Sequence, residues 1–445
     1  MAQFIKATAM TGLTRVISRI LGLLAMILVA RTLGPEGHGQ YTLAYLLATT
    51  TIALMNFGLV PTTIYYLANG KYPRGQVLGH LVLFHLLSTA LALSSGWLIV
   101  KHYADLFFPQ TPRTYLDLSL LSIPGILTYR FLQGALLGTQ RFDLYNLGQM
   151  FWAILHFILL ALFVPILKMG VSGALVAEAL SWSLSAALLW HWSRSVVPHW
   201  TSRINRVLLK GILRYGFYSY VGGLLAFFNE RVDIYLINLF QGPKAVGLYS
   251  VAVGLAERLW FISHTASLVL LPRISASSDA KWKRRFTPLV TRTVLLMVLP
   301  PALLLALFAR PILVLLYSEQ YLPAARPLQI LLLGIVAFSI SRILAHDLAG
   351  RGHPLLNTYT SALSLAVNVV LNLILLPRWG ITGAAWASAL SYSSLLFSKI
   401  IFYRQLSGNT WRDIIWITRS DLHLYRITIQ QALTHIKQRW RGSRT

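Results

Sequence analysis

The chain has 445 residues, of which 56% are hydrophobic and only 12% are charged. Soluble domains carry about 25% charged residues, so this composition, with a mean hydropathy of +0.61, is typical of a membrane protein. The absence of cysteine excludes disulfides and thiol chemistry. The net charge of +26 would suggest nucleic acid in a soluble protein, but here it must first be placed relative to the membrane.

Apolar runs long enough to cross a bilayer recur along the chain, since a spanning helix needs about 20 such residues. Twelve spans are expected, at 13–34, 41–67, 76–100, 114–137, 144–167, 171–192, 212–240, 246–271, 287–316, 324–348, 355–376 and 381–403. The runs are too long and too uniformly apolar for β-barrel strands, so we expect an all-α polytopic membrane protein. Pro300, Pro301 and Pro311 predict a kink or break in the ninth span.

Lysine and arginine are distributed unevenly between the two sides of these spans. With the N-terminus inside, the inside loops and their flanks hold 27 of the 39, and the outside loops hold eight. Because Lys and Arg concentrate in cytoplasmic loops, both termini are expected in the cytoplasm. The high net charge then faces the anionic lipids of the inner leaflet and requires no nucleic acid.

Two motifs recur and indicate an internal duplication. The pattern G-P-x-x-x-G-x-Y occurs at 34–41 and at 242–249, an offset of 208 residues. The pattern G-x-x-G-A begins at Gly170 and at Gly380, an offset of 210. Each half therefore contains six spans. Because six is even, both halves start on the same side and are parallel repeats, as in some transporter folds.

The repeat predicts four segments: an N-terminal six-helix bundle at 1–192, a cytoplasmic linker at 193–211, a C-terminal six-helix bundle at 212–403 and a tail at 404–445. The tail carries an apolar stripe at helical spacing, flanked by arginines: Trp411, Ile415, Leu422, Tyr425, Ile429, Leu433, Ile436 and Trp440. This pattern favours an interfacial amphipathic helix. A helix packed on cytoplasmic loops is the alternative.

Ionisable residues within the spans are the candidate functional residues, because a charge at membrane depth is costly and usually lines a pathway. The arginines are Arg19, Arg130, Arg231, Arg258 and Arg342, and the acids are Glu178, Glu230, Asp233, Glu257 and Asp347. In the functional interpretation the arginines line a cavity and bind an anionic head group, because guanidinium can bind phosphate bidentately. The acids are then coupling or cavity groups.

A structural interpretation of the same residues stays open. The acids can neutralise the arginines, so that the set only fixes helix register. Arg130 and Arg342 are eight residues before Gly138 and Gly350 and hold equivalent places in the two halves. They can therefore face one another, or they can extend to the cytoplasmic surface.

Catalytic motifs are absent from the sequence, which contains no H-E-x-x-H, no Walker A pattern and no G-x-S-x-G. We therefore expect no enzyme and no cofactor. No metal site is expected either, because His80 and His85 are five residues apart, which is a poor spacing for one ion on one helix.

The motifs together resemble the polysaccharide-transport branch (O-antigen and lipid-linked oligosaccharide flippases) of the multidrug/oligosaccharidyl-lipid/polysaccharide (MOP) flippase superfamily. The resemblance rests on Ser18-Arg19-Ile20-Leu21-Gly22, both Gly-Pro motifs, Asp233 and both G-x-x-G-A motifs, and it covers about 1–403. It implies two bundles that alternate between inward- and outward-open forms. The implied cargo is a polyprenyl-diphosphate-linked oligosaccharide, moved to the periplasmic leaflet of the bacterial inner membrane for surface polysaccharide such as lipopolysaccharide.

The resemblance also implies partners and leaves one alternative. The expected partners are the lipid-linked glycan, membrane lipids and a polysaccharide polymerase. Ser18 and Arg19 are similar to the start of the lipid II flippases and imply a diphosphate contact, but Ala25 and Met26 depart from the arginine and acid that follow there. A drug/cation antiporter of the same fold (MATE-like) is the alternative, although it would need acids in the first span, which has none.

Overall fold

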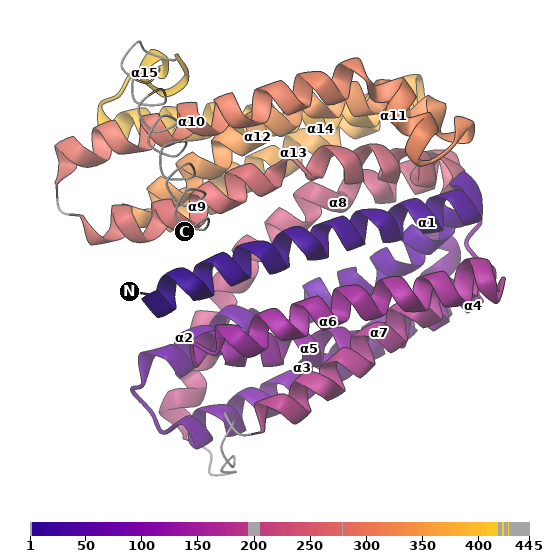
Figure 1. Ribbon diagram of the computed structural model, residues 1–445, viewed down its shortest axis with the longest axis horizontal. Coiled ribbons are helices and arrows are strands. Elements are labelled where there is room, and N and C mark those ends of the chain that lie inside the picture. Colours follow the sequence, from indigo (N-terminus) through magenta and orange to yellow (C-terminus); the bar gives the residue numbers. More distant parts are fainter. Residues whose placement is uncertain (1, 195–204, 278, 417–420, 422–425, 427–445) are drawn as a thin grey trace, which may run out of the picture. The chain divides into compact units, whose positions relative to one another are not determined.

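The computed structural model describes residues 2–194, 205–277, 279–416, 421 and 426 (Figure 1). Its elements are α1 (Ala2–Met55), α2 (Leu59–Asn69), α3 (Arg74–Phe107), α4 (Arg113–Leu120), α5 (Ser122–Gly138), α6 (Phe142–Ala161), η1 (Leu162–Ile166), α7 (Gly170–Ser193), α8 (Arg206–Glu257), α9 (Trp260–Ala276), α10 (Ala280–Leu307), α11 (Ala309–Leu316), η2 (Glu319–Ala324), α12 (Ala325–Gly350), α13 (Pro354–Trp379), α14 (Ile381–Ser407) and α15 (Trp411–Ile415). These described residues contain no strand, and the expected all-α class is confirmed.

The length and composition of the helices are those of a multi-pass membrane protein. Among the described residues, eight helices are long and apolar enough to cross a membrane, or up to nine if the bent pair α8 and α9 counts as one span. Large apolar side chains such as Leu307 and Leu315, each 74% exposed, point outward as they would toward lipid. Because α1 and α8 each join two of the expected spans, the number twelve stays a prediction.

Both long helices are interrupted at the glycine of the Gly-Pro motif. Gly34 has φ 67° and ψ 179°, and Gly242 has φ 77° and ψ −175°, so neither is helical. This backbone region is open essentially only to glycine. The following prolines, Pro35 and Pro243, start the next helical segment, where a missing N–H does no harm. The motif therefore ends one helical segment and begins the next.

The two copies of the motif also pack against each other. A Cβ atom on Gly39 would lie 1.8 Å from the carbonyl oxygen of Pro243, and a Cβ on Gly247 would lie 1.8 Å from the carbonyl oxygen of Pro35. His38 Nδ1 lies 3.3 Å from the carbonyl oxygen of Gly247. Each motif therefore uses its second glycine to admit the proline carbonyl of the other copy, and this reciprocal contact explains why the pattern occurs twice.

The chain divides into two compact units. The first contains Met1–Leu255, Phe308–Leu331 and Ser364–Ser388, and the second contains Ala256–Leu307, Leu332–Leu363 and Ala389–Thr445. Both Gly-Pro motifs belong to the first unit. The predicted bundles at 1–192 and 212–403 stay a prediction, and most of the predicted linker between them lies outside the described residues.

Small residues bring helices close together inside the first unit. Ala25 and Val29 of α1 pack with Leu160, Val164, Ala174 and Ala177 from α6, η1 and α7. The glycines of the second motif show the same closeness, since a Cβ on Gly173 would lie 2.9 Å from the oxygen of Phe163 and a Cβ on Gly383 would lie 2.3 Å from that of Leu375. These contacts are the close approach that the G-x-x-G-A pattern predicts.

The second unit has a core of its own and holds the start of the tail. Leu270 and Ile274 of α9 pack with Val294 and Val298 of α10 and Ile343 of α12. The break expected in the ninth span falls at Phe308, and the paired prolines lie inside α10.

The described start of the tail packs on the second unit. Ile414 of α15 is fully buried beside Leu344 and Tyr403. Arg292 of α10 binds Asp421 through Nε at 2.7 Å and through Nη2 at 2.9 Å. The rest of the predicted amphipathic stripe lies outside the described residues.

Candidate functional site: buried carboxylates and arginines

Glu178 is the buried acid of the N-terminal half, and it is 4% exposed on α7. The hydroxyl of Tyr41, the tyrosine of the first Gly-Pro motif, donates to Glu178 Oε2 at 2.8 Å. The indole N–H of Trp182 donates to Oε1 at 2.7 Å, and His156 Nδ1 lies 3.5 Å from Oε2. Both carboxylate oxygens are therefore bound within the apolar interior, as a buried charge requires.

Asp233 is the buried acid bound by the motif tyrosine of the C-terminal half, and it is 3% exposed on α8. The hydroxyl of Tyr249, the tyrosine of the second motif, donates to Asp233 Oδ2 at 2.6 Å. The Ser388 hydroxyl donates to the same oxygen at 3.1 Å, and the backbone N–H of Ile234 donates to Oδ1 at 2.8 Å. This carboxylate is also bound on both oxygens, and all four residues belong to the first unit.

The two sites are related by the internal repeat, but their acids come from different helices. Tyr41 and Tyr249 are 208 residues apart, and Glu178 and Ser388 are 210 apart, so each motif tyrosine contacts the same repeat position. That position holds the acid in the first half and a serine in the second. At the offset of 208, the residue equivalent to Asp233 is Ala25.

A strip of buried amides extends the Asp233 site by one helical turn. Asn229 lies four residues before Asp233, on the same face of α8, and is 3% exposed. The Ser364 hydroxyl donates to Asn229 Oδ1 at 3.3 Å, and the Asn368 amide donates to the Asn229 carbonyl at 3.5 Å. Asn372 then donates to Asn368 Oδ1 at 2.6 Å. The strip runs along α13 and is buried throughout.

Of the five candidate arginines, the structure places three in the first unit. Arg19 and Arg231 are half-buried, and Arg130 is exposed. The charges of Arg130 and Glu178 both act on the hydroxyl of Tyr45, so these two predicted residues lie in one neighbourhood. Arg231 donates to the backbone oxygen of its neighbour Glu230 at 3.0 Å, and its charge acts on Asp233.

The other two arginines lie in the second unit. Arg258 is half-buried in the turn after α8, next to Glu257, the last residue of that helix. The guanidinium of Arg342 stacks over the rings of Trp260, at 5.3 Å, and Phe338, at 5.0 Å. Because Arg130 and Arg342 fall in different units, their expected position opposite one another stays a prediction.

A buried cationic cluster surrounds Arg342. Lys399 of α14 is 4% exposed, and among the described residues no carboxylate forms an ion pair with it. The charges of Arg342, His264 and Lys399 all act on His346. Lys399 does not stand out in the sequence, because it lies near the end of an expected span, among the lysines and arginines of the cytoplasmic flank. A buried cluster of cationic side chains is suited to an anion.

Asp347 has the geometry of a structural acid. It is fully buried, accepts a hydrogen bond from Thr287 at 2.6 Å and pairs with Arg351 Nε at 2.5 Å. Arg351 in turn stacks over the ring of Tyr403. The Thr287 hydrogen bond and the Tyr403 ring contact link this ion pair to α10 and α14. The part of the chain that the structure describes holds no group of three His, Asp or Glu residues that could bind a metal ion.

The arrangement defines a class of protein: a helical membrane protein with duplicated halves and buried, hydrogen-bonded charges, as in transporters. The model of the family described as "Polysaccharide biosynthesis protein" matches residues 28–326, and the chain belongs to this family. The expected resemblance to the polysaccharide-transport branch of the MOP superfamily is thereby confirmed.

Two archaeal relatives match the chain. A protein of Haloferax volcanii, the probable low-salt glycan biosynthesis flippase Agl15, is 23% identical over 376 residues, which cover 83% of this chain and 77% of that one. An uncharacterised membrane protein of Methanocaldococcus jannaschii is 27% identical over 217 residues, covering 48% of this chain. The match spans only 43% of that relative's length.

Solved structures share the fold. The lipid II flippase MurJ in an inward closed conformation aligns with a TM-score of 0.75 at 15% identity, covering 89% of this chain and 90% of that one. An inward-facing multidrug resistance MATE family transporter of the MOP superfamily aligns with a TM-score of 0.68 at 18% identity, covering 88% and 95%. The chain therefore has the fold of the MOP flippases and transporters.

Proposed function

We propose that this protein is a flippase that moves a polyprenyl-diphosphate-linked oligosaccharide from the cytoplasmic to the outer leaflet by alternating access. The proposed location is the bacterial inner membrane, with both termini in the cytoplasm. Family membership and the relative named as a probable glycan biosynthesis flippase support the glycan-lipid cargo. A polysaccharide polymerase is the proposed partner that would consume the product.

The observation that carries the cargo class is the cationic cluster of Arg342 and the buried Lys399. Arg342 is oriented by two aromatic rings, and the buried Lys399 acts on the same histidine as Arg342. A diphosphate carries several charges and acceptor oxygens, and guanidinium groups bind it by charge-assisted hydrogen bonds. We propose that Arg19, Arg130, Arg231, Arg258 and Arg342 contact the diphosphate and the sugars at successive stages of transport.

The buried acids are proposed to couple transport to a proton or another cation. Glu178 and Asp233 are the candidates, because each is held by a motif tyrosine in repeat-related surroundings. A carboxylate in an apolar interior changes its hydrogen bonding when it is neutralised, and that change can bias two arrangements of helices. Glu230 and Glu257 are proposed as cavity acids, and Asp347 as the weakest coupling candidate because of its ion pair.

Transport is tested with the purified chain in proteoliposomes that contain a labelled polyprenyl-diphosphate oligosaccharide. A membrane-impermeant glycosidase reports how much of the glycan has reached the outer leaflet. We expect Arg231→Ala and Arg258→Ala to abolish transport while the protein still folds and reconstitutes. Arg113→Ala is the matched control, because Arg113 forms an exposed ion pair with Asp105 at 2.6 Å, which contributes at most about 1 kcal/mol.

A drug/cation antiporter is the second candidate, favoured by the fold shared with the MATE transporter and by the two buried acids. The two functions give opposite results in cells. Deletion should block surface glycan and trap the lipid-linked intermediate if the chain is a flippase. Raised drug sensitivity with normal surface glycan would instead establish the antiporter.

A further inference from the structure

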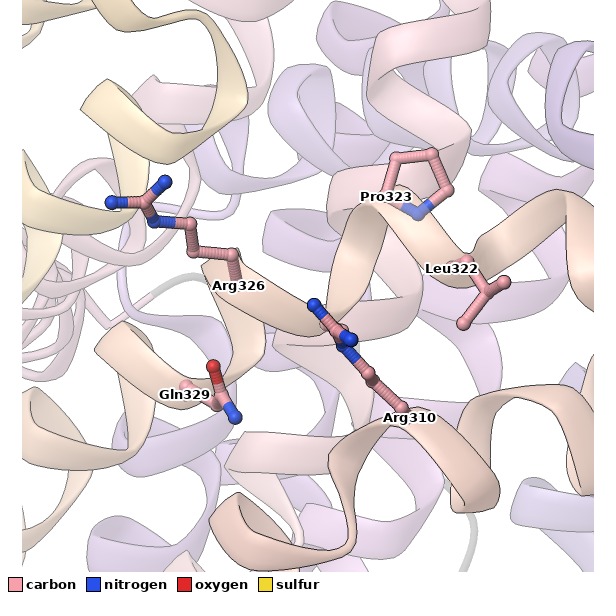
Figure 2. A pocket seen from close by; sticks show the side chains of 6 residues that line it. Arg310, Leu322, Pro323, Arg326 and Gln329 are labelled. Atoms are coloured by element: carbon pink, nitrogen blue, oxygen red, sulfur yellow. The ribbon is translucent and has the colours of Figure 1, made fainter.

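A cationic pocket lies in the first unit, away from the buried carboxylates. It has a volume of about 390 Å³ and is formed where α11, η2 and α12 succeed one another. Its lining residues are Arg310, Leu322, Pro323, Ala325, Arg326 and Gln329 (Figure 2). In Figure 2 the Arg310 side chain extends from its helix toward the turn that carries Pro323 and Arg326. The volume is near the lower end of the range for ligand pockets, about 300–1,000 Å³.

The charge of this pocket is unbalanced. Arg310 and Arg326 are exposed, and neither forms an ion pair with a carboxylate among the described residues. Each is the second residue of its helix, and neither helix has an acid in its first turn. The helix dipole is positive at the start of α11, so the guanidinium group of Arg310 lies where a cation is disfavoured. A bound anion would offset both arginines and the start of α11 together.

The wall of the pocket is anchored firmly to α1. Tyr321 is fully buried, and its hydroxyl donates to the carbonyl oxygen of Ala30 at 3.0 Å. Arg31 donates from Nε to the oxygen of Leu316 at 2.8 Å and from Nη2 to that of Leu315 at 2.5 Å. The pocket is therefore preorganised and lies at the end of the helical segment that Gly34 terminates. In the proposed topology, this end faces the outer side of the membrane.

The lining is amphiphilic as well as cationic. Leu322 is 39% exposed, and Pro323 is also exposed beside the arginines. Apolar contact next to two guanidinium groups suits the junction between a lipid chain and a phosphorylated head group. We propose that this pocket binds the phosphate groups of a lipid head group on the outer side, and that the occupant is the diphosphate of the translocated cargo before release. The cargo assignment rests on the proposed function.

Binding is tested with farnesyl diphosphate as the probe and the full chain in phosphatidylcholine nanodiscs. We expect the double variant Arg310→Gln/Arg326→Gln to bind the probe with a Kd at least about tenfold higher. Each charge-assisted hydrogen bond that is lost is worth about tenfold or more in affinity. Arg378→Gln, which removes an exposed arginine of the same unit, should stay within about twofold of the wild type. Equal affinity of the double variant and the wild type for farnesyl diphosphate would overturn the proposal that this pocket binds phosphate.

A second arm separates the two sources of lipid phosphate. Nanodiscs that contain phosphatidylglycerol should leave the affinity of the wild type for farnesyl diphosphate nearly unchanged if the pocket is specific for the diphosphate. If phosphatidylglycerol instead displaces the probe from the wild type but not from the double variant, the occupant is bulk anionic lipid. That outcome supports the phosphate site and overturns the cargo assignment.

Transport measurements distinguish this proposal from the proposed function. If the wild type binds the probe through Arg310 and Arg326 but does not move the glycan lipid in proteoliposomes, the flippase proposal fails and the pocket stands. If the wild type moves the glycan lipid, and the double variant binds the probe and moves the glycan lipid as well as the wild type does, only the pocket proposal fails. We expect the double variant to lose at least about tenfold in transport rate, because the cargo diphosphate would lose its contact with the two arginines on the outer side before release.

Discussion

Replacing Gly39 with alanine tests whether the reciprocal contact between the Gly-Pro motifs organises the first unit. The added methyl group would lie 1.8 Å from the carbonyl oxygen of Pro243, 2.6 Å from its carbonyl carbon and 3.0 Å from the amide nitrogen of Gly247. The obstacle is backbone in a helix, so no flexible side chain can move aside. The two helices must separate instead.

The size of the effect follows from the required movement. Ordinary van der Waals contact of a Cβ atom begins at 3.4 Å, so the helices must separate by more than an ångström at this point. Overpacking of this kind typically costs about 1–3 kcal/mol, and a rigid obstacle places Gly39→Ala at the upper end. Gly247→Ala should cost a similar amount, because its methyl would lie 1.8 Å from the oxygen of Pro35. The double variant should cost less than the sum, since one separation relieves both clashes.

The assay is thermal unfolding of the purified protein in detergent, followed by the loss of a monodisperse peak on size exclusion. Gly223→Ala is the matched control, because a Cβ on this α8 glycine meets nothing within 4 Å. The control should melt at the wild-type temperature or slightly above, since alanine favours helix. Gly39→Ala should melt several degrees lower. If Gly39→Ala and the control melt alike, the reciprocal contact does not hold the two motifs together.

Three further predictions concern single charges. Glu178→Gln should lower transport at least about tenfold and destabilise the protein by about 1–3 kcal/mol, because one donor loses its acceptor; Glu36→Gln, at an exposed site, should change neither. Lys399→Met should keep or raise the melting temperature, because an apolar side chain replaces a buried charge, yet reduce transport if the cluster binds anions. The Thr410 backbone N–H holds the pKa of Asp413 below its usual value of 3.8. The ionised carboxylate therefore stabilises the fold of the tail above about pH 4, and this contribution is lost as pH falls through the lowered pKa. Hydrogen exchange at 408–416 should rise only below that pH, and unchanged exchange would contradict the reasoning.

The helices and their breaks could be predicted because local chemistry decides them. Uninterrupted apolar runs fix where spans lie, and a glycine followed by proline at 34 and 242 can only interrupt a helix in this way. The packing of Gly39 against Pro243 could not be predicted, because it depends on how two helices 208 residues apart in sequence approach each other. The repeated motif nevertheless indicates that both copies meet the same packing constraint at their glycines.

The candidate site could be predicted only in part, because its contacts also join residues that are far apart in the sequence. Glu178 and Asp233 stand out as charges in apolar runs, but their tyrosine partners do not, because a tyrosine in a span is common. The repeat offsets contain the missing signal, since they place Tyr41 and Tyr249 at one equivalent position and Glu178 and Ser388 at another. Lys399 carries no such signal, and only its burial in the folded second unit distinguishes it from a surface lysine.

The acid that binds the motif tyrosine lies on different helices in the two halves. Tyr41 is held by an acid on α7, whereas Tyr249 is held by an acid on α8 together with Ser388 on α14. Neutralising Glu178 would therefore loosen a contact between α1 and α7, and neutralising Asp233 would loosen contacts of α8 with α14. We propose that the two halves therefore respond differently to proton or cation binding, because the acid bridges α1 and α7 in the first half but lies on the same helix as its tyrosine in the second.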